Sequence, residues 1–176
     1  MMTDQNKIFR IAQSCLHCIA NIACYRAGWN DNKTPPVLRN LEDFWIRVNG
    51  NFLDVATLNW CILFADEKDG KHDWRRAFKN KKGLNENFYS SLNTTEQDFK
   101  EGLLEIKNYR DKYLAHMDNP SPILYPKTGF MLDSASYLFG LLKSHKETKA
   151  LLGGIYESAE SHFEEKYEGA LKIINT

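Results

Sequence analysis

The chain has 176 residues, of which 43% are hydrophobic and 26% are charged, and this composition is typical of one soluble globular domain. Basic and acidic residues both number 23, which argues against a protein that coats nucleic acid through its overall charge. The longest apolar run, Trp60–Ala65, is too short to cross a membrane, and the polar N-terminus lacks a signal-peptide core. We therefore expect a single cytoplasmic domain over residues 1–176.

Hydrophobic residues at helical spacing predict five helices, and no segment shows the alternation of a β-strand. The predicted helices lie at about residues 3–27, 37–65, 95–116, 130–145 and 148–174. Glycine and proline mark loops at Gly28–Pro36, in part of Gly70–Asn93 and at Asn119–Pro126. The pattern predicts an all-α domain, built as a bundle of four or five helices.

The first predicted helix contains Cys15 and Cys18, which match the C-x-x-C pattern of metal and redox sites. No second cysteine or histidine pair completes a zinc site. Both residues share one helical face with isoleucines, so we interpret them as small core residues of a reduced, disulfide-free chain. Metal or redox chemistry is the alternative.

The second predicted helix has an apolar face that we expect to pack in the core. That face consists of Phe44, Val48, Phe52, Val55 and either Leu58 or Asn59. Gly50 lies within the same helix and is a candidate for a kink.

The segment Lys71–Lys82 holds six basic residues and one acid, with Trp74 and Phe78 among them. Such a segment can bind RNA through phosphate neutralisation and base stacking, which makes Arg75 and Arg76 candidate substrate-binding residues. The alternative is a solvated connection that buries one tryptophan as an anchor.

Several reaction classes are excluded by missing motifs. The sequence has no E-x-x-H pair, H-E-x-x-H, P-loop, G-x-G-x-x-G or G-x-S-x-G. We therefore expect neither a metal nor a cofactor. The isolated His17, His145 and His162 are interpreted as packing or surface residues. The last helix has a solvent-exposed acidic face made of Glu157, Glu160, Glu164, Glu165 and Glu168.

The third predicted helix begins at a Thr95 cap, with Asp98 three residues later. Its apolar stripe runs through Phe99, Leu103, Ile106, Arg110, Tyr113 and Met117. An arginine in such a stripe needs a partner, because an unpaired buried charge costs several kcal/mol. That partner is an internal acid, a second protein chain or a phosphate. The candidate acids are Glu42, Asp43 and Asp54.

The end of this helix resembles a known family. Arg110, five further residues and His116 resemble the R-x4–6-H motif of the HEPN superfamily, and Asp111 is the polar residue that commonly follows the arginine. The sequence YRDKYLAHMD, from Tyr109 to Asp118, is similar to the corresponding segment of the abortive-infection-type HEPN domains of bacteria. The similarity in sequence covers about ten residues.

The resemblance implies a HEPN-like bundle that works as a metal-independent endoribonuclease at a homodimer interface. Arg110 would stabilise the phosphate and His116 would transfer the proton. Asp111, Lys112 and Tyr113 would orient these groups or contact the RNA. Residues six apart on an α-helix are rotated by about 120°. We therefore expect the stripe to face a second chain as well as the core, so that two sites converge.

The resemblance also implies a role in antiviral defence, abortive infection, stress response or a toxin–antitoxin system. RNA, a second copy of the chain and an antitoxin protein are the expected partners; Asp118 stands where the antitoxin-paired subtype carries a tyrosine. One alternative is a non-catalytic HEPN-like module for dimerisation and for binding a partner or nucleotide. Another is a purely structural bundle in which Arg110 forms a core ion pair.

Overall fold

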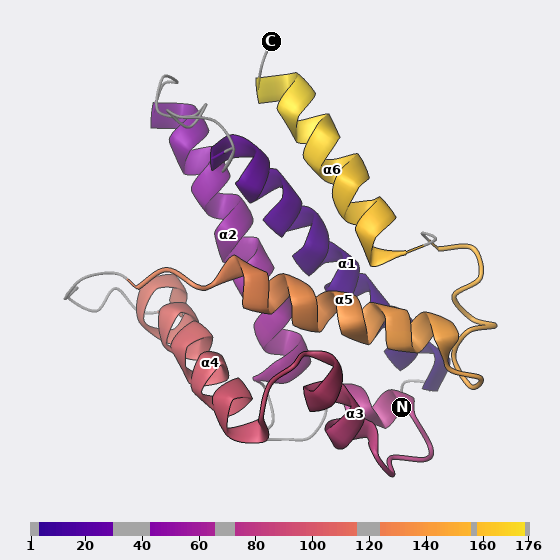
Figure 1. Cartoon of the computed structure of the whole chain (residues 1–176). Helices are drawn as coiled ribbons and strands as arrows, with labels where there is room; N and C mark the ends of the chain where they lie inside the picture. Colours follow the sequence, from indigo (N-terminus) through magenta and orange to yellow (C-terminus); the bar gives the residue numbers. More distant parts are fainter. Residues whose placement is uncertain (1–3, 30–42, 66–72, 116–123, 156–157, 175–176) are drawn as a thin grey trace.

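The computed structural model describes residues 4–29, 43–65, 73–115, 124–155 and 158–174 (Figure 1). All regular elements in these ranges are helical, which confirms the predicted all-α class. Within the described ranges, no helix is long and apolar enough to span a membrane.

In the part of the chain that the structure describes, six α-helices form the bundle. They are α1 (Asp4–Trp29), α2 (Asp43–Phe64), α3 (Leu84–Ser91), α4 (Glu96–Tyr109), α5 (Thr128–Ser144) and α6 (Ala159–Ile174). A short 3₁₀ helix, Trp74–Ala77, precedes α3, and a π-helix, Arg110–Ala115, follows α4 without a break. The short α3 lies inside a stretch that we expected to be partly loop.

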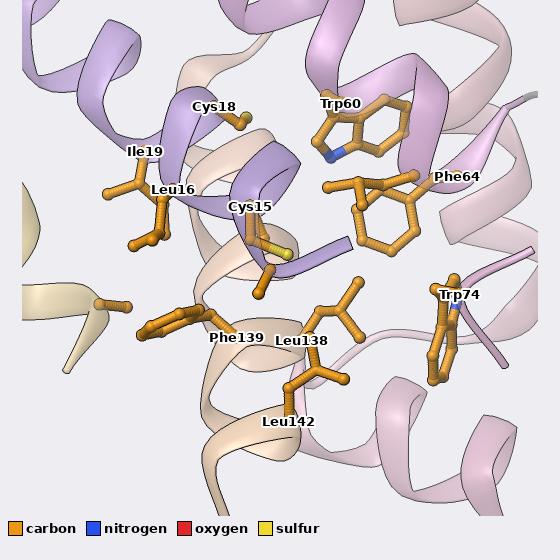
Figure 2. Close-up of a cluster of buried hydrophobic side chains, with 14 of the residues drawn as sticks. Cys15, Leu16, Cys18, Ile19, Trp60, Phe64, Trp74, Leu138, Phe139 and Leu142 are labelled. Atoms are coloured by element: carbon orange, nitrogen blue, oxygen red, sulfur yellow. The ribbon is translucent and has the colours of Figure 1, made fainter. Parts of the chain in front are cut away.

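The long helix α1 contacts α2, α5 and α6 (Figure 1). Its inner face includes Cys15 and Cys18, both fully buried, and Figure 2 shows them in the same cluster as Trp60 and Leu138. Burial raises the pKa of both thiols and keeps them protonated. The interpretation of these cysteines as core residues is therefore confirmed. Among the described residues, no group of three or more histidine, cysteine or acidic side chains is placed to hold a metal.

Aromatic rings join α2, α3, α4 and α5 at one end of the bundle. Ring centroids lie 5.7 Å apart for Phe64 and Phe88, 5.1 Å for Phe88 and Phe99, and 5.0 Å for Phe99 and Phe130. The fully buried Trp60 donates from Nε1 to Ser134 Oγ at 2.8 Å. This cluster anchors the N-terminal half of α4 and so positions the motif segment at its C-terminal end.

The prediction of which face of α2 is buried is wrong. Phe44, Val55 and Leu58 are 62%, 41% and 43% exposed, whereas the buried residues include Leu53 and Trp60. Both sides of α2 carry apolar residues at helical spacing, so periodicity alone could not choose between them. The helix runs unbroken through Gly50.

The prediction places the start of the last helix too early, at about residue 148. Residues 145–155 form turns, and α6 starts only at Ala159. Thr148 is buried and donates from its hydroxyl to the Leu142 carbonyl at 2.5 Å, a bond that closes the turn after α5. Ser158 Oγ accepts from the Ser161 amide at 3.0 Å and caps α6. The predicted acidic face is exposed at its described positions, Glu160, Glu164, Glu165 and Glu168, and Glu157 lies outside the described residues.

Candidate functional site

The start of α4 follows the predicted capping pattern. Thr95 Oγ1 accepts from the Asp98 amide at 3.1 Å, and Asp98 Oδ2 accepts from the Thr95 hydroxyl at 2.7 Å. Phe99 and Ile106 of the predicted stripe are then buried in the chain's own core. The stripe therefore packs within the chain at Phe99 and Ile106, while Leu103, Arg110 and Tyr113 are half-buried.

The α-helix ends at Tyr109 and a π-helix takes over through Ala115. The expectation of one continuous α-helix over this segment is wrong. In a π-helix the hydrogen bond runs to the fifth residue, so the 100° step and the 120° angle between motif positions do not apply here. Single-turn π-helical segments within α-helices occur often at functional sites.

Arg110 lies at this change of helix type. Its side chain is 18% exposed, and its Nε donates to Asp111 Oδ1 at 2.8 Å; the Asp111 side chain is 44% exposed. The two neighbours form a charge-assisted hydrogen bond at the edge of the core. Tyr113, the next position of the stripe, is also half-buried, and Lys112 is exposed.

Sequence periodicity missed one contact of this segment. The buried Tyr109 donates from its hydroxyl to Asp54 Oδ1 of α2 at 2.8 Å. Burial, followed by this hydrogen bond and the charge of Asp54, raises the pKa of Tyr109. Asp54, one of the acids considered as a partner for Arg110, therefore binds the residue before it. This bond fastens the start of the π-helix to the middle of α2.

His116 lies outside the described residues, as does Glu42, the first of the candidate acids. Of the predicted site, the structure brings together Arg110, Asp111, Lys112 and Tyr113 on one helical turn. The pairing of the arginine with the histidine stays a prediction.

The basic segment does not offer its aromatic rings to RNA. Trp74 and Phe78 are both buried, so base stacking on them is excluded and the anchoring alternative is confirmed for Trp74. Arg75 Nε donates to Asp73 Oδ1 at 2.7 Å, while Arg76 is exposed. Lys71 and His72 lie outside the described residues.

Arg75 borders a cavity of about 430 Å³ whose lining does not include Arg110. Its lining combines charged with aromatic side chains. Among its lining residues are Asp73, Arg75, Asn85, Tyr89, Glu96, Phe99 and Lys100. The two arginine sites predicted from sequence are thus attached to different elements, one to the 3₁₀ helix and one to the π-helix.

The fold and site define an all-α bundle with an arginine–aspartate pair on a π-helical turn. Comparison of the chain with protein-family models, curated proteins and solved structures gave no match. The function must therefore be inferred from the residues themselves.

Proposed function

We propose that the chain is a metal-independent endoribonuclease of HEPN type, which acts as a homodimer in bacterial defence, stress response or a toxin–antitoxin system. The observation that supports this proposal is the placement of Arg110. A half-buried guanidinium, oriented by Asp111 and set on a π-helical turn, has the chemistry of a phosphate-binding group. In a toxin–antitoxin setting, an antitoxin protein would be a further partner.

The reaction needs three functions. A base takes the proton of the ribose 2′-hydroxyl, a cation stabilises the pentacoordinate phosphorane, and an acid protonates the leaving 5′-oxygen. In this proposal Arg110 stabilises the phosphorane, because its charge is permanent and its planar fork matches phosphate oxygens. His116 moves the proton, because histidine titrates near neutral pH.

Asp111 acts as a positioning residue in this scheme. Its bond to Arg110 Nε at 2.8 Å limits rotation of the guanidinium, so less side-chain entropy is lost when phosphate binds. Lys112 and Tyr113 lie on the same turn and would contact the RNA backbone. Exposed Arg76 would add a distant electrostatic contact to the bound RNA, and Arg75 a second one.

The test is cleavage of total RNA by the purified protein in EDTA, with detection of fragments that end in 2′,3′-cyclic phosphate. We expect Arg110→Ala and His116→Ala each to abolish these fragments. The matched control is Arg10→Ala, which removes an exposed arginine of α1 and should leave cleavage unchanged. Cleavage that survives both motif substitutions, or that requires a divalent metal, would contradict the proposal.

The second candidate is a non-catalytic module that binds a nucleotide or a protein partner. The cavity beside Arg75 favours it, because a concave site that combines aromatic side chains with a few charged and polar groups suits a small ligand. The RNA experiment distinguishes the two, since the second candidate yields no cyclic-phosphate fragments from the wild-type protein.

A further inference from the structure

The outward face of α2 carries an exposed stripe of uncharged residues. It comprises Phe44, Val48, Asn51, Val55, Leu58 and Ile62. Phe44, Val55, Leu58 and Ile62 are each at least 40% exposed, Asn51 is exposed, and Val48 is half-buried. Scattered exposed apolar residues are ordinary, but a continuous apolar stripe along one helix marks an interaction surface.

The spacing of the stripe identifies the kind of partner. Its steps are four, three, four, three and four residues, which is the heptad repeat of a helix that packs against another helix. Val48, Val55 and Ile62 take the a positions and are all β-branched, and Leu58 takes a d position. Phe44 and Asn51 take the other d positions, and Asn51 is the single polar residue of the stripe.

The two flanks of the stripe differ. On one side, Asp54 binds Tyr109, which fastens the π-helix beside the stripe. On the other side, an apolar groove of about 540 Å³ lies between α2 and α6, and Phe52 and Ile173 are among its lining residues. The stripe therefore runs between the candidate active-site turn and an apolar groove.

We propose that the outward face of α2 pairs with the same face of a second copy of this chain, in antiparallel orientation. A two-fold interface requires a surface that is complementary to itself. The stripe meets this condition because it is uncharged, so that pairing opposes no like charges along the seam. With the two-fold axis near Leu53, Val48 lies beside Leu58 of the second copy, Val55 beside Asn51, and Ile62 beside Phe44. All six stripe residues are then used.

The antiparallel orientation follows from the position of the π-helix, and this step rests on the proposed function. A two-fold axis perpendicular to the paired helices carries the Asp54 flank of each copy to the same side of the seam. Both Arg110 turns then lie on one side of the dimer, as a shared cleft requires. In a parallel pair the axis runs along the helices, and the two turns lie on opposite sides.

The area of the stripe predicts how tightly the two copies bind each other. A strip about 27 Å long and about 10 Å wide covers roughly 300 Å², whereas a stable interface buries about 800 Å² on each partner. The flanking groove and π-helix must supply the remainder. We therefore expect a dimer that dissociates upon dilution to low micromolar concentration.

The first test is sedimentation velocity on the wild-type chain and on single variants, between about 5 and 200 µM, without RNA. We expect dimerisation that increases with concentration, and monomers for Val55→Asp and Leu58→Asp with unchanged helical circular dichroism. The matched control is Leu104→Asp, which places the same charge at an exposed leucine of α4 and should remain dimeric. A wild-type chain that stays monomeric at 200 µM, or a dimeric Leu58→Asp, overturns the proposal.

Disulfide trapping provides an independent test of orientation. The double variant Val48→Cys/Leu58→Cys should form a covalent dimer upon oxidation, because these positions are neighbours only in the antiparallel pair. Cross-linking of the single variant Leu58→Cys requires the parallel pair and overturns the proposed arrangement. Failure here is distinct from failure of the nuclease chemistry. A dimer that cleaves no RNA contradicts the nuclease and leaves the interface standing, whereas a monomer that cleaves RNA contradicts the interface and the homodimeric site and leaves the cleavage activity standing.

Discussion

The helices α2 and α6 both pack on α1, yet their outward faces differ in chemistry (Figure 1). The exposed positions of α6 are rich in charge and include Glu160, Glu164 and Glu168. Those of α2 include Val55 and Leu58. Both helices bury an inner face, so packing of the single chain does not explain the difference. Charge on α6 suits contact with water, and the apolar face of α2 suits contact with another protein surface.

The largest expected effect is the difference in the free energy of unfolding between a substitution on the inner face of α2 and one on its outer face. Trp60→Ala should lower the free energy of unfolding by about 3–5 kcal/mol, because it leaves a cavity in the core. Leu58→Ala on the outer face should change it by less than about 0.5 kcal/mol at a concentration where the chain is monomeric. Urea unfolding measures both values. A loss of several kcal/mol from Leu58→Ala would mean that this face is already covered within one chain.

The next effect concerns the edge where the outer face of α2 meets the π-helix. Tyr109→Phe should cost about 1–2 kcal/mol, since it removes the hydrogen bond to Asp54. The pKa of Tyr109 is raised in the folded chain, so its contribution is complete below about pH 10 and is lost as the pH rises further. Unfolding curves between pH 8 and 11 test this dependence. Tyr167→Phe, at a half-buried tyrosine of α6, is the control and should show the same pH dependence as the wild type.

A smaller effect concerns the inner face of α6. His162 is buried, its Nε2 lies 3.1 Å from the Leu16 carbonyl oxygen of α1, and burial lowers its pKa. The neutral form is favoured in the folded chain, so stability is complete above about pH 6.5 and falls as the pH falls, by at most about 1.4 kcal/mol per pH unit. His162→Gln should flatten this slope in thermal unfolding between pH 5 and 7. The exposed His17→Gln should retain most of the slope, because the charge of His17 is only the last of the causes that shift the pKa of His162. A slope abolished by His17→Gln and retained in His162→Gln would mean that the assignment to His162 is wrong.

The smallest effect is expected on the outward face of α6. Changing Glu160, Glu164 and Glu168 together to glutamine should alter the free energy of unfolding by less than about 0.5 kcal/mol per site, because exposed charges contribute little. The oligomeric state seen in sedimentation should not change. A shift toward monomer would place the interface on α6 and remove the contrast with α2.

Local sequence patterns predicted the features that depend on neighbouring residues. The Thr95 cap, the burial of Phe99 and Ile106, and the packing of Cys15 and Cys18 all follow from spacing along one helix. The arginine at position 110 was recognisable as unusual for the same reason. These features need only helical geometry, which repeats every 3.6 residues whatever the rest of the chain does.

Tertiary structure decided which face of α2 is buried and where α4 ends. Both sides of α2 have apolar periodicity, and the choice depends on which side fits α1, with small residues such as Ala56 on the buried side. The π-helix begins where Tyr109 binds Asp54, a partner 55 positions earlier in the chain. The spacing of residues along one helix contains no information about a partner that lies so far away in the sequence. The sequence alone therefore determined the helical class and the candidate arginine, and the packed chain decided what surrounds that arginine.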